Sequence, residues 1–186
     1  MKLISIFVSD DSEEGLWSIH LNSESQNEFD KFFDQMNDPE WLHEFLEKNK
    51  ADLNSGFFGN ITIGEAVLRT MEEAEEMENT LYDYSEEGFT DSGVNLQNLF
   101  KPLNNFEYAI TIHQESKARI GRGWLRLYAI RLAKNCYLVT GGTVKQTENM
   151  KRTHLQNELK KLEQAKRFLR NNGIAYPEDL NNHQDE

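Results

Sequence analysis

The chain has 186 residues, of which 38% are apolar and 28% charged. This length and composition fit one mid-sized folded domain and exclude a chain that is disordered throughout. The single cysteine, Cys136, excludes an internal disulfide and any zinc site that needs two cysteines. No apolar stretch approaches the ~18 residues of a membrane helix, and the first residues turn acidic too early for a secretory signal. We therefore expect a cytoplasmic protein that does not enter the membrane.

The charge is distributed very unevenly along the chain. The formal net charge is −12, but residues 1–99 carry −18, residues 100–173 carry +10 and the last 13 residues carry −4. Such a split indicates nucleic-acid binding by the basic part. Charged surfaces that are merely solvated would explain the same split.

The first 23 residues predict a strand pair. Residues 2–8 and 16–21 are short runs rich in β-branched or aromatic side chains, and the polar stretch between them resembles a turn. We expect an N-terminal hairpin here.

Residues 24–101 predict an acidic, all-helical insertion. Phe29, Phe32, Phe33 and Met36 lie at helical spacing, and a second helix begins at Pro39 after the N-cap residue Asp38. Thr62 is the expected cap of a long helix that extends to about residue 84, and residues 95–100 predict a short helix.

Residues 102–173 predict three strands and a final helix. The strands are expected at 106–113, 124–131 and 136–140, with Tyr108, Ile110 and Ile112 on one face of the first. A basic loop follows the first strand, and Gly141-Gly142 is expected to end the third. The last helix is expected to begin after Thr147 and to end at Asn171-Asn172-Gly173, before an acidic tail at 174–186.

A basic cluster is the most informative feature for function. If the three strands form a meander, Trp124, Arg126, Tyr128 and Ile130 share one face of the middle strand. A buried arginine is costly unless its surroundings are open or paired, so we expect a concave, solvated sheet face rather than a second core. The alternative is that Arg126 pairs with an acid of the helical segment. The cluster comprises Lys117, Arg119, Arg122, Arg126, Arg131 and Lys145.

The segment from Leu125 to Gly173 resembles the RelE/ParE superfamily of toxin–antitoxin toxins, in particular its HigB-like branch. The matching features are LRLYAIR, which fits an R-x-Y/F-x-x-R strand, then a turn, CYLVTGGTVKQT and a long, lysine-rich helix. The resemblance covers about the last 70 residues and leaves residues 24–100 outside it. It implies an α+β fold in which a small antiparallel sheet is flanked by helices, within a single domain of residues 1–186.

In its ribonuclease members, the resemblance implies metal-independent mRNA cleavage, often on the ribosome, without a cofactor. Arg126 then matches the strand arginine that contacts the scissile phosphate, and Lys145 matches the basic residue after the third strand. Lys117, Arg119 and Arg122 match basic positions of the loop, with Arg131 as a further RNA-binding residue. Positive donors around a phosphate stabilise the charge that grows in the transition state.

The general acid and base have no assignment from the motif, and Tyr128 and His113 are the candidates. Gln146 stands where a second basic residue is frequent. ParE-like members act on gyrase and are not ribonucleases, so the fold alone does not decide whether the chain is an enzyme.

Three hypotheses follow. The first is a RelE-type toxin that binds RNA or the ribosome, with a cognate antitoxin as a further partner. Its acidic segment would either pack beside the basic face or shape the choice of partner, and a further hypothesis is that it masks the basic face electrostatically. The second is a non-catalytic protein on the same scaffold that binds a protein partner through its acidic helices. The third is an acidic mimic of nucleic acid, against which the bases after residue 100 argue.

Overall fold

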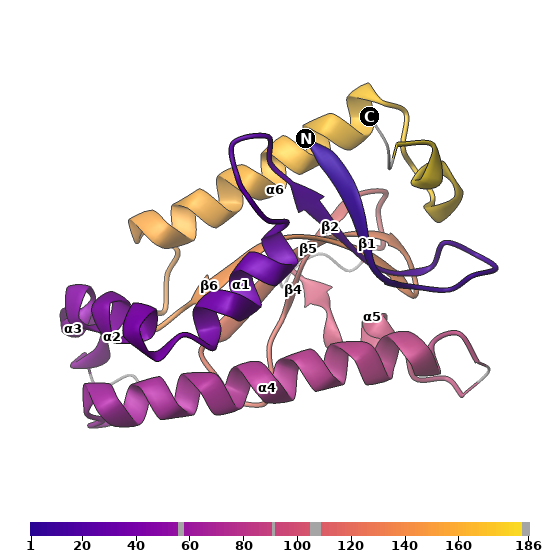
Figure 1. The fold of residues 1–186 in the computed structure, drawn as a ribbon. Helices are drawn as coiled ribbons and strands as arrows, with labels where there is room; N and C mark the ends of the chain where they lie inside the picture. Colours follow the sequence, from indigo (N-terminus) through magenta and orange to yellow (C-terminus); the bar gives the residue numbers. More distant parts are fainter. Residues whose placement is uncertain (56–57, 91, 105–108, 184–186) are drawn as a thin grey trace.

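Helices cover both faces of a central sheet in the computed structural model (Figure 1), which describes residues 1–55, 58–90, 92–104 and 109–183. The strands are β1 (Lys2–Val8), β2 (Gly15–His20), β3 (Lys101–Pro102), β4 (Gln114–Ala118), β5 (Leu125–Ala133) and β6 (Cys136–Val144). The helices are α1 (Glu28–Met36), α2 (Pro39–Lys48), α3 (Lys50–Leu53), α4 (Ile63–Glu87), α5 (Leu96–Leu99) and α6 (Thr153–Asn171). Two 3₁₀ turns follow, Pro177–Asp179 and Asn181–His183.

The sheet of the described residues has six strands in the order β1-β2-β6-β5-β4-β3. The β2–β6 pair is parallel and the other pairs are antiparallel, so the sheet is mixed rather than antiparallel throughout. The expectation of an α+β fold is confirmed. The expected meander exists as β4-β5-β6.

Each face of the sheet has its own hydrophobic core, because side chains alternate along β5. Leu125, Leu127 and Ala129 pack with the helices of the acidic segment. Tyr128 and Ile130 pack on the other face, with the apolar stripe of α6. Figure 1 shows α6 on one side of the sheet and α4 on the other.

The N-terminal hairpin and the helix caps are confirmed. β1 pairs with β2 in antiparallel register. The Asp38 side chain accepts hydrogen bonds from the first backbone N–H groups of α2, and Thr62 forms a capping box with Glu65 at the start of α4. These local signals work because the capping bonds are made within three residues of the chain.

The prediction of a strand at 106–113 is wrong for residues 109–113, which are the part of it that the structure describes. Residues 109–113 are not a strand, Ile110 and Ile112 are each 62% exposed, and Tyr108 lies outside the described residues. The first strand of the meander is β4 instead, within the segment expected to be a basic loop. Only Gln114, Ser116 and Ala118 of β4 are buried, so the strand lacks the apolar alternation that sequence patterns detect.

The third strand does not end at Gly141-Gly142, since β6 continues to Val144. A side chain at Gly142 would collide with the ring of Phe32 from α1, and one at Gly141 would collide with the Glu158 carboxylate from α6. The two glycines therefore allow helices on both faces to approach the strand. The last helix begins at Thr153, six residues after the expected cap, and ends as expected at Asn171.

The face of β5 that bears Arg126 is open at one end only. Tyr128 and Ile130 lie in the core beneath α6, so only the Arg126 end of that face is open. Trp124, which precedes β5, packs into the opposite core. The expectation of no second core is therefore wrong, because the apolar stripe of α6 covers the rest of the face.

The acidic segment is part of the core, since α1, α2 and α4 bury apolar side chains against one face of the sheet. At the other end of the chain, Ile174 and Leu180 of the segment expected as an acidic tail are also buried, in the core beneath α6.

A buried carboxylate pair links α6 to α1. The Lys161 ammonium donates to Glu28 Oε2 at 2.5 Å and forms an ion pair with Glu158 Oε1 at 2.9 Å. One oxygen of each carboxylate is buried without a hydrogen-bond partner within the described part of the chain. Burial raises the pKa of Glu158 to about 7, and the nearby Glu28 carboxylate adds to the rise.

Glu158 should therefore make the free energy of unfolding depend on pH. Because its folded-state pKa is raised, the folded chain binds more protons than the unfolded chain between pH 4.5 and about 7, and stability falls as the pH rises through that window. Glu158→Gln should remove this fall. The measurement is urea unfolding of both proteins across the window, and taking their difference removes the opposing contributions of the buried His113 and the half-buried His154, whose pKa values burial lowers. Parallel pH profiles of the two proteins would contradict the assignment.

Candidate functional site: a basic cavity at the sheet edge

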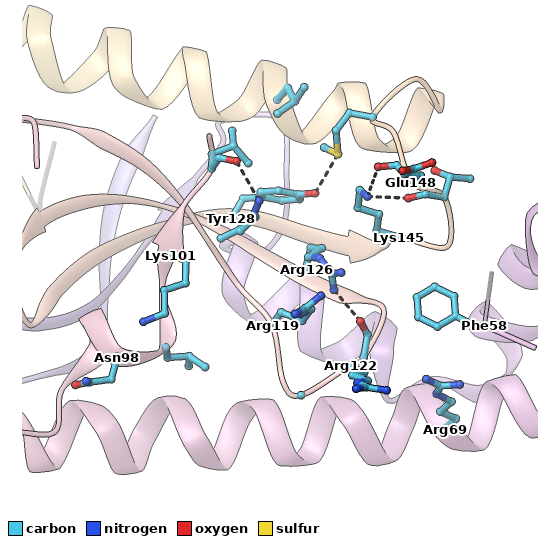
Figure 2. A pocket seen from close by; sticks show the side chains of 18 residues that line it. Phe58, Arg69, Asn98, Lys101, Arg119, Arg122, Arg126, Tyr128, Lys145 and Glu148 are labelled. Atoms are coloured by element: carbon cyan, nitrogen blue, oxygen red, sulfur yellow. Dashed lines mark hydrogen bonds between the residues drawn. The ribbon is translucent and has the colours of Figure 1, made fainter. Parts of the chain in front are cut away.

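A cavity of about 1150 Å³ lies at the end of β5, between α4 and α6. Figure 2 shows Lys145 and Tyr128 toward α6 and Arg69 toward α4, with Arg119, Arg122 and Arg126 between them. The polar residues of its lining are mostly basic: Arg69, Lys101, Lys117, Arg119, Arg122, Arg126 and Lys145. Glu148 is the one acidic residue in the described part of the lining.

Six of the eight predicted site residues line this cavity: Lys117, Arg119, Arg122, Arg126, Tyr128 and Lys145. The sheet register explains why they meet. Lys117 of β4 is paired with Tyr128 of β5, and Arg126 is paired with Thr143 of β6, two residues before Lys145. The loop 119–123 then returns the chain from β4 to β5 over the same end of the sheet.

Arg126 is the most buried cation of the site, with 9% of the residue exposed. Its Nη1 group donates to the backbone carbonyls of Gly123 at 3.0 Å and Leu125 at 2.6 Å, which fix the guanidinium. Burial lowers the pKa of Arg126, and Arg119 lowers it further, but an arginine stays charged at neutral pH. No carboxylate of the described residues lies within ion-pair distance, so the expected alternative of a paired Arg126 is not found there.

The two lysines of the site hold their ammonium groups through backbone carbonyls. Lys117 Nζ donates to Leu103 O at 3.0 Å, and Lys145 Nζ donates to Thr147 O at 2.7 Å and Glu148 O at 2.9 Å. Burial lowers the pKa of both lysines, and the charge of Arg126 lowers each further. The cations therefore raise one another's free energy, and an anion in the cavity would relieve that repulsion.

Tyr128 lies on the α6 side of the cavity with its hydroxyl 3.7 Å from Met150 Sδ. Burial raises the pKa of this phenol far above neutral pH. The side chain therefore keeps its proton and serves as a hydrogen-bond donor rather than as a base.

His113 and Arg131 do not join the cavity. The buried His113 ring contacts Ile174 O through Nε2 at 2.6 Å, and burial lowers its pKa. Arg131 Nη2 donates to Gln97 Oε1 at 3.0 Å and so ties β5 to α5. The expectation that these two residues share the site is wrong in geometry: His113 lies at the far end of β4, and Arg131 lies five residues along β5 from Arg126.

Sequence reasoning missed Arg69, Phe58 and Lys101, which also line the cavity. Arg69 is the single basic residue of α4, and a lone base within an acidic helix was a signal that could have been followed. Lys101 belongs to β3, a two-residue strand that has no detectable sequence pattern.

Among the described residues, no acid of the helical segment forms an ion pair with Arg69, Arg126 or Lys145. In the part of the chain that the structure describes, the ion pairs between the segment and the basic half connect Glu28 with Lys161 and Asp52 with Arg152, and neither base lines the cavity. Glu73 is an acid of this segment whose charge acts on the site, since it raises the pKa of Arg126. Its carboxylate accepts from the backbone N–H groups of Trp124 at 3.1 Å and Leu125 at 2.8 Å, and burial raises its pKa. Glu73 therefore anchors the start of β5 to α4.

Comparison of the chain with protein-family models, with curated proteins and with solved structures finds no match. The resemblance to the RelE/ParE superfamily therefore rests on the sequence motifs alone. Within the described residues, no helix is long and apolar enough to cross a membrane, and no group of three or more His, Cys, Asp or Glu residues is placed to hold a metal ion.

Loss of the Glu73 carboxylate should destabilise the fold. Glu73→Ala leaves two buried backbone N–H groups without an acceptor, and we expect a loss of about 2 kcal/mol in the free energy of unfolding. Urea unfolding measures it. Glu72→Ala, at the exposed neighbouring position, is the matched control and should change stability by no more than ~0.5 kcal/mol. Equal effects of the two substitutions would contradict the anchoring role.

Proposed function

We propose that this chain is a RelE-type toxin, similar to the HigB-like branch, which binds mRNA in the basic cavity and cleaves it. The observation that supports this most is the convergence of Lys117, Arg119, Arg126 and Lys145 on one cavity, in which the buried Arg126 has no carboxylate at ion-pair distance among the described residues. An ordinary protein surface pairs or solvates such cations separately. A cavity that collects them favours a phosphodiester ligand.

The chemistry proposed for the cavity is transesterification within the RNA. The ribose 2′-oxygen attacks the adjacent phosphorus and loses its proton, while the bond from phosphorus to the 5′-oxygen breaks and that oxygen gains a proton. The products are a 2′,3′-cyclic phosphate and a 5′-hydroxyl. Two negative charges accumulate on the phosphorane oxygens in the transition state, and these are the charges that fixed cationic donors stabilise.

The roles of the residues follow from their surroundings. Arg126 is rigid and always charged, so it binds the phosphate and stabilises the phosphorane. Lys117 and Lys145 have lowered pKa values, which favours them over Tyr128 as the groups that exchange protons with the 2′- and 5′-oxygens. Tyr128 keeps its proton and orients the substrate.

The competing candidate is a non-catalytic protein that binds a partner through its acidic helices. It is favoured by the outward face of α4, where Glu72, Glu75 and Glu76 are exposed and, in the described part of the chain, form no ion pair. On this reading the basic cavity would have no catalytic part.

The double substitution Arg126→Ala and Lys145→Ala distinguishes the two candidates. Removal of one such donor lowers the rate of catalysis about 10²–10³-fold. RNA cleavage by the purified double variant should therefore fall below the detection limit of the assay. The measurement is the appearance of 2′,3′-cyclic phosphate ends on a labelled RNA, together with growth of cells that express each protein.

Arg167→Ala is the control, because Arg167 is exposed on α6 and does not line the cavity. It should cleave RNA at the wild-type rate, and circular dichroism should show all three proteins folded. Cleavage by the folded double variant, or no cleavage by the wild-type chain, would overturn the proposal and leave the interaction protein as the better account.

A further inference from the structure

Arg69 is held in an unusual setting on the α4 side of the cavity. Its guanidinium carbon lies 4.5 Å from the centre of the Trp124 ring and 5.4 Å from that of Phe58. Those two rings pack edge to face at 5.4 Å, and the buried Trp124 is further fixed by its indole N–H, which donates to Thr70 Oγ1 at 3.1 Å. The guanidinium therefore has a fixed position before any ligand arrives.

The cation–π contacts stabilise the Arg69 guanidinium without neutralising its charge. No carboxylate of the described residues lies within ion-pair distance of Arg69. Both carboxylate oxygens of the nearby Glu73 accept hydrogen bonds from the backbone N–H groups of Trp124 and Leu125. Within the described residues, the Arg69 guanidinium also makes no hydrogen bond. A planar cation that is ordered by aromatic rings and lines a cavity is suited to bind an anion or a flat base.

The size of the cavity fits a ligand that reaches both walls. Its volume of about 1150 Å³ exceeds the ~300–1,000 Å³ of ordinary small-molecule sites. Arg69 projects from α4 and contacts the Phe58 ring, whereas Lys145 and Tyr128 lie toward α6 (Figure 2). A single phosphate on Arg126 would leave the α4 wall empty, but the next nucleotide of a chain would extend onto it.

We infer that Arg69 and Phe58 form a second nucleotide subsite, which holds the nucleotide next to the one whose phosphate binds Arg126. The inference rests on the proposed function. It assigns the substrate class as single-stranded RNA of two or more nucleotides, because a base can stack on the half-buried Phe58 ring only when it is unpaired. It also makes the acidic helical segment part of the binding site, since both residues belong to it.

The test measures binding of two probes that cannot be cleaved. One is a 2′-O-methyl RNA tetranucleotide, and the other is a single 2′-O-methyl nucleotide with phosphates at both ends. Arg69→Gln replaces the guanidinium by a shorter, planar amide and so removes the charge. It should weaken tetranucleotide binding about tenfold, lower the salt dependence of binding by about one phosphate contact, and leave mononucleotide binding unchanged.

Arg69→Lys is the second variant. It keeps the charge, so the salt dependence should match that of the wild type, while the loss of the planar group should give an intermediate affinity. Unchanged mononucleotide binding shows that each variant is folded. Arg126→Ala should weaken both probes, and the exposed Arg167→Ala should weaken neither.

The outcomes separate the two claims. If Arg126→Ala weakens both probes while Arg69→Gln binds the tetranucleotide like the wild type, the subsite is wrong and the proposed function stands. Equal weakening of both probes by Arg69→Gln also contradicts a separate subsite. If neither probe binds the wild-type chain, the proposed function fails and the subsite fails with it.

Discussion

The site depends on a buried guanidinium that the protein fixes without neutralising it. Arg126 points from β5 into the end of the sheet face that α6 does not cover, and two backbone carbonyls hold its Nη1 group. Desolvating a cation is costly, and pairing it with an acid would be the simple compensation. The chain contains 32 acids, yet none in the described part pairs with Arg126. The unpaired charge is understandable if an anion from outside supplies the pairing.

The acidic segment has a structural part in this arrangement rather than the masking part that its charge suggests. Its helices complete one core of the sheet, and Glu73 is turned inward to anchor the strand that bears Arg126. Its exposed acids lie on α1, α2 and α4, and none of those in the described residues lines the cavity. Long-range attraction between these acids and the cavity cations is screened by salt over about 10 Å, whereas contacts within the cavity are not.

The sequence predicted those parts of the fold that local patterns determine. Three such features were predicted: the helix caps at Asp38 and Thr62, the apolar stripe of α1 and the end of α6 at Asn171. Each depends on residues that are close together in the chain. β4 escaped detection because it lies near the sheet edge with polar side chains, and the exposed Ile110 and Ile112 imitated a strand pattern before it. Gly141 and Gly142 were misread because their function, the close approach of α1 and α6, is a tertiary contact.

The residues of the candidate site also fall into those that local sequence patterns could place and those that only tertiary packing places. Arg126, Tyr128 and Lys145 could be placed together because strand alternation and a hairpin register determine their neighbours. His113 was misplaced along with the strand that was expected to carry it. Arg69 and Phe58 could not be placed, because they reach the cavity through the packing of α4 against Trp124, and no sequence pattern encodes that distance.

A crystal structure of the chain with a 2′-O-methyl RNA tetranucleotide tests the central claim most directly. The account predicts a phosphate oxygen within hydrogen-bonding distance, about 2.7–3.2 Å, of Arg126, between Lys117 and Lys145. An empty cavity, with the RNA bound instead along the exposed bases Lys160, Arg167 and Arg170 of α6, would contradict it.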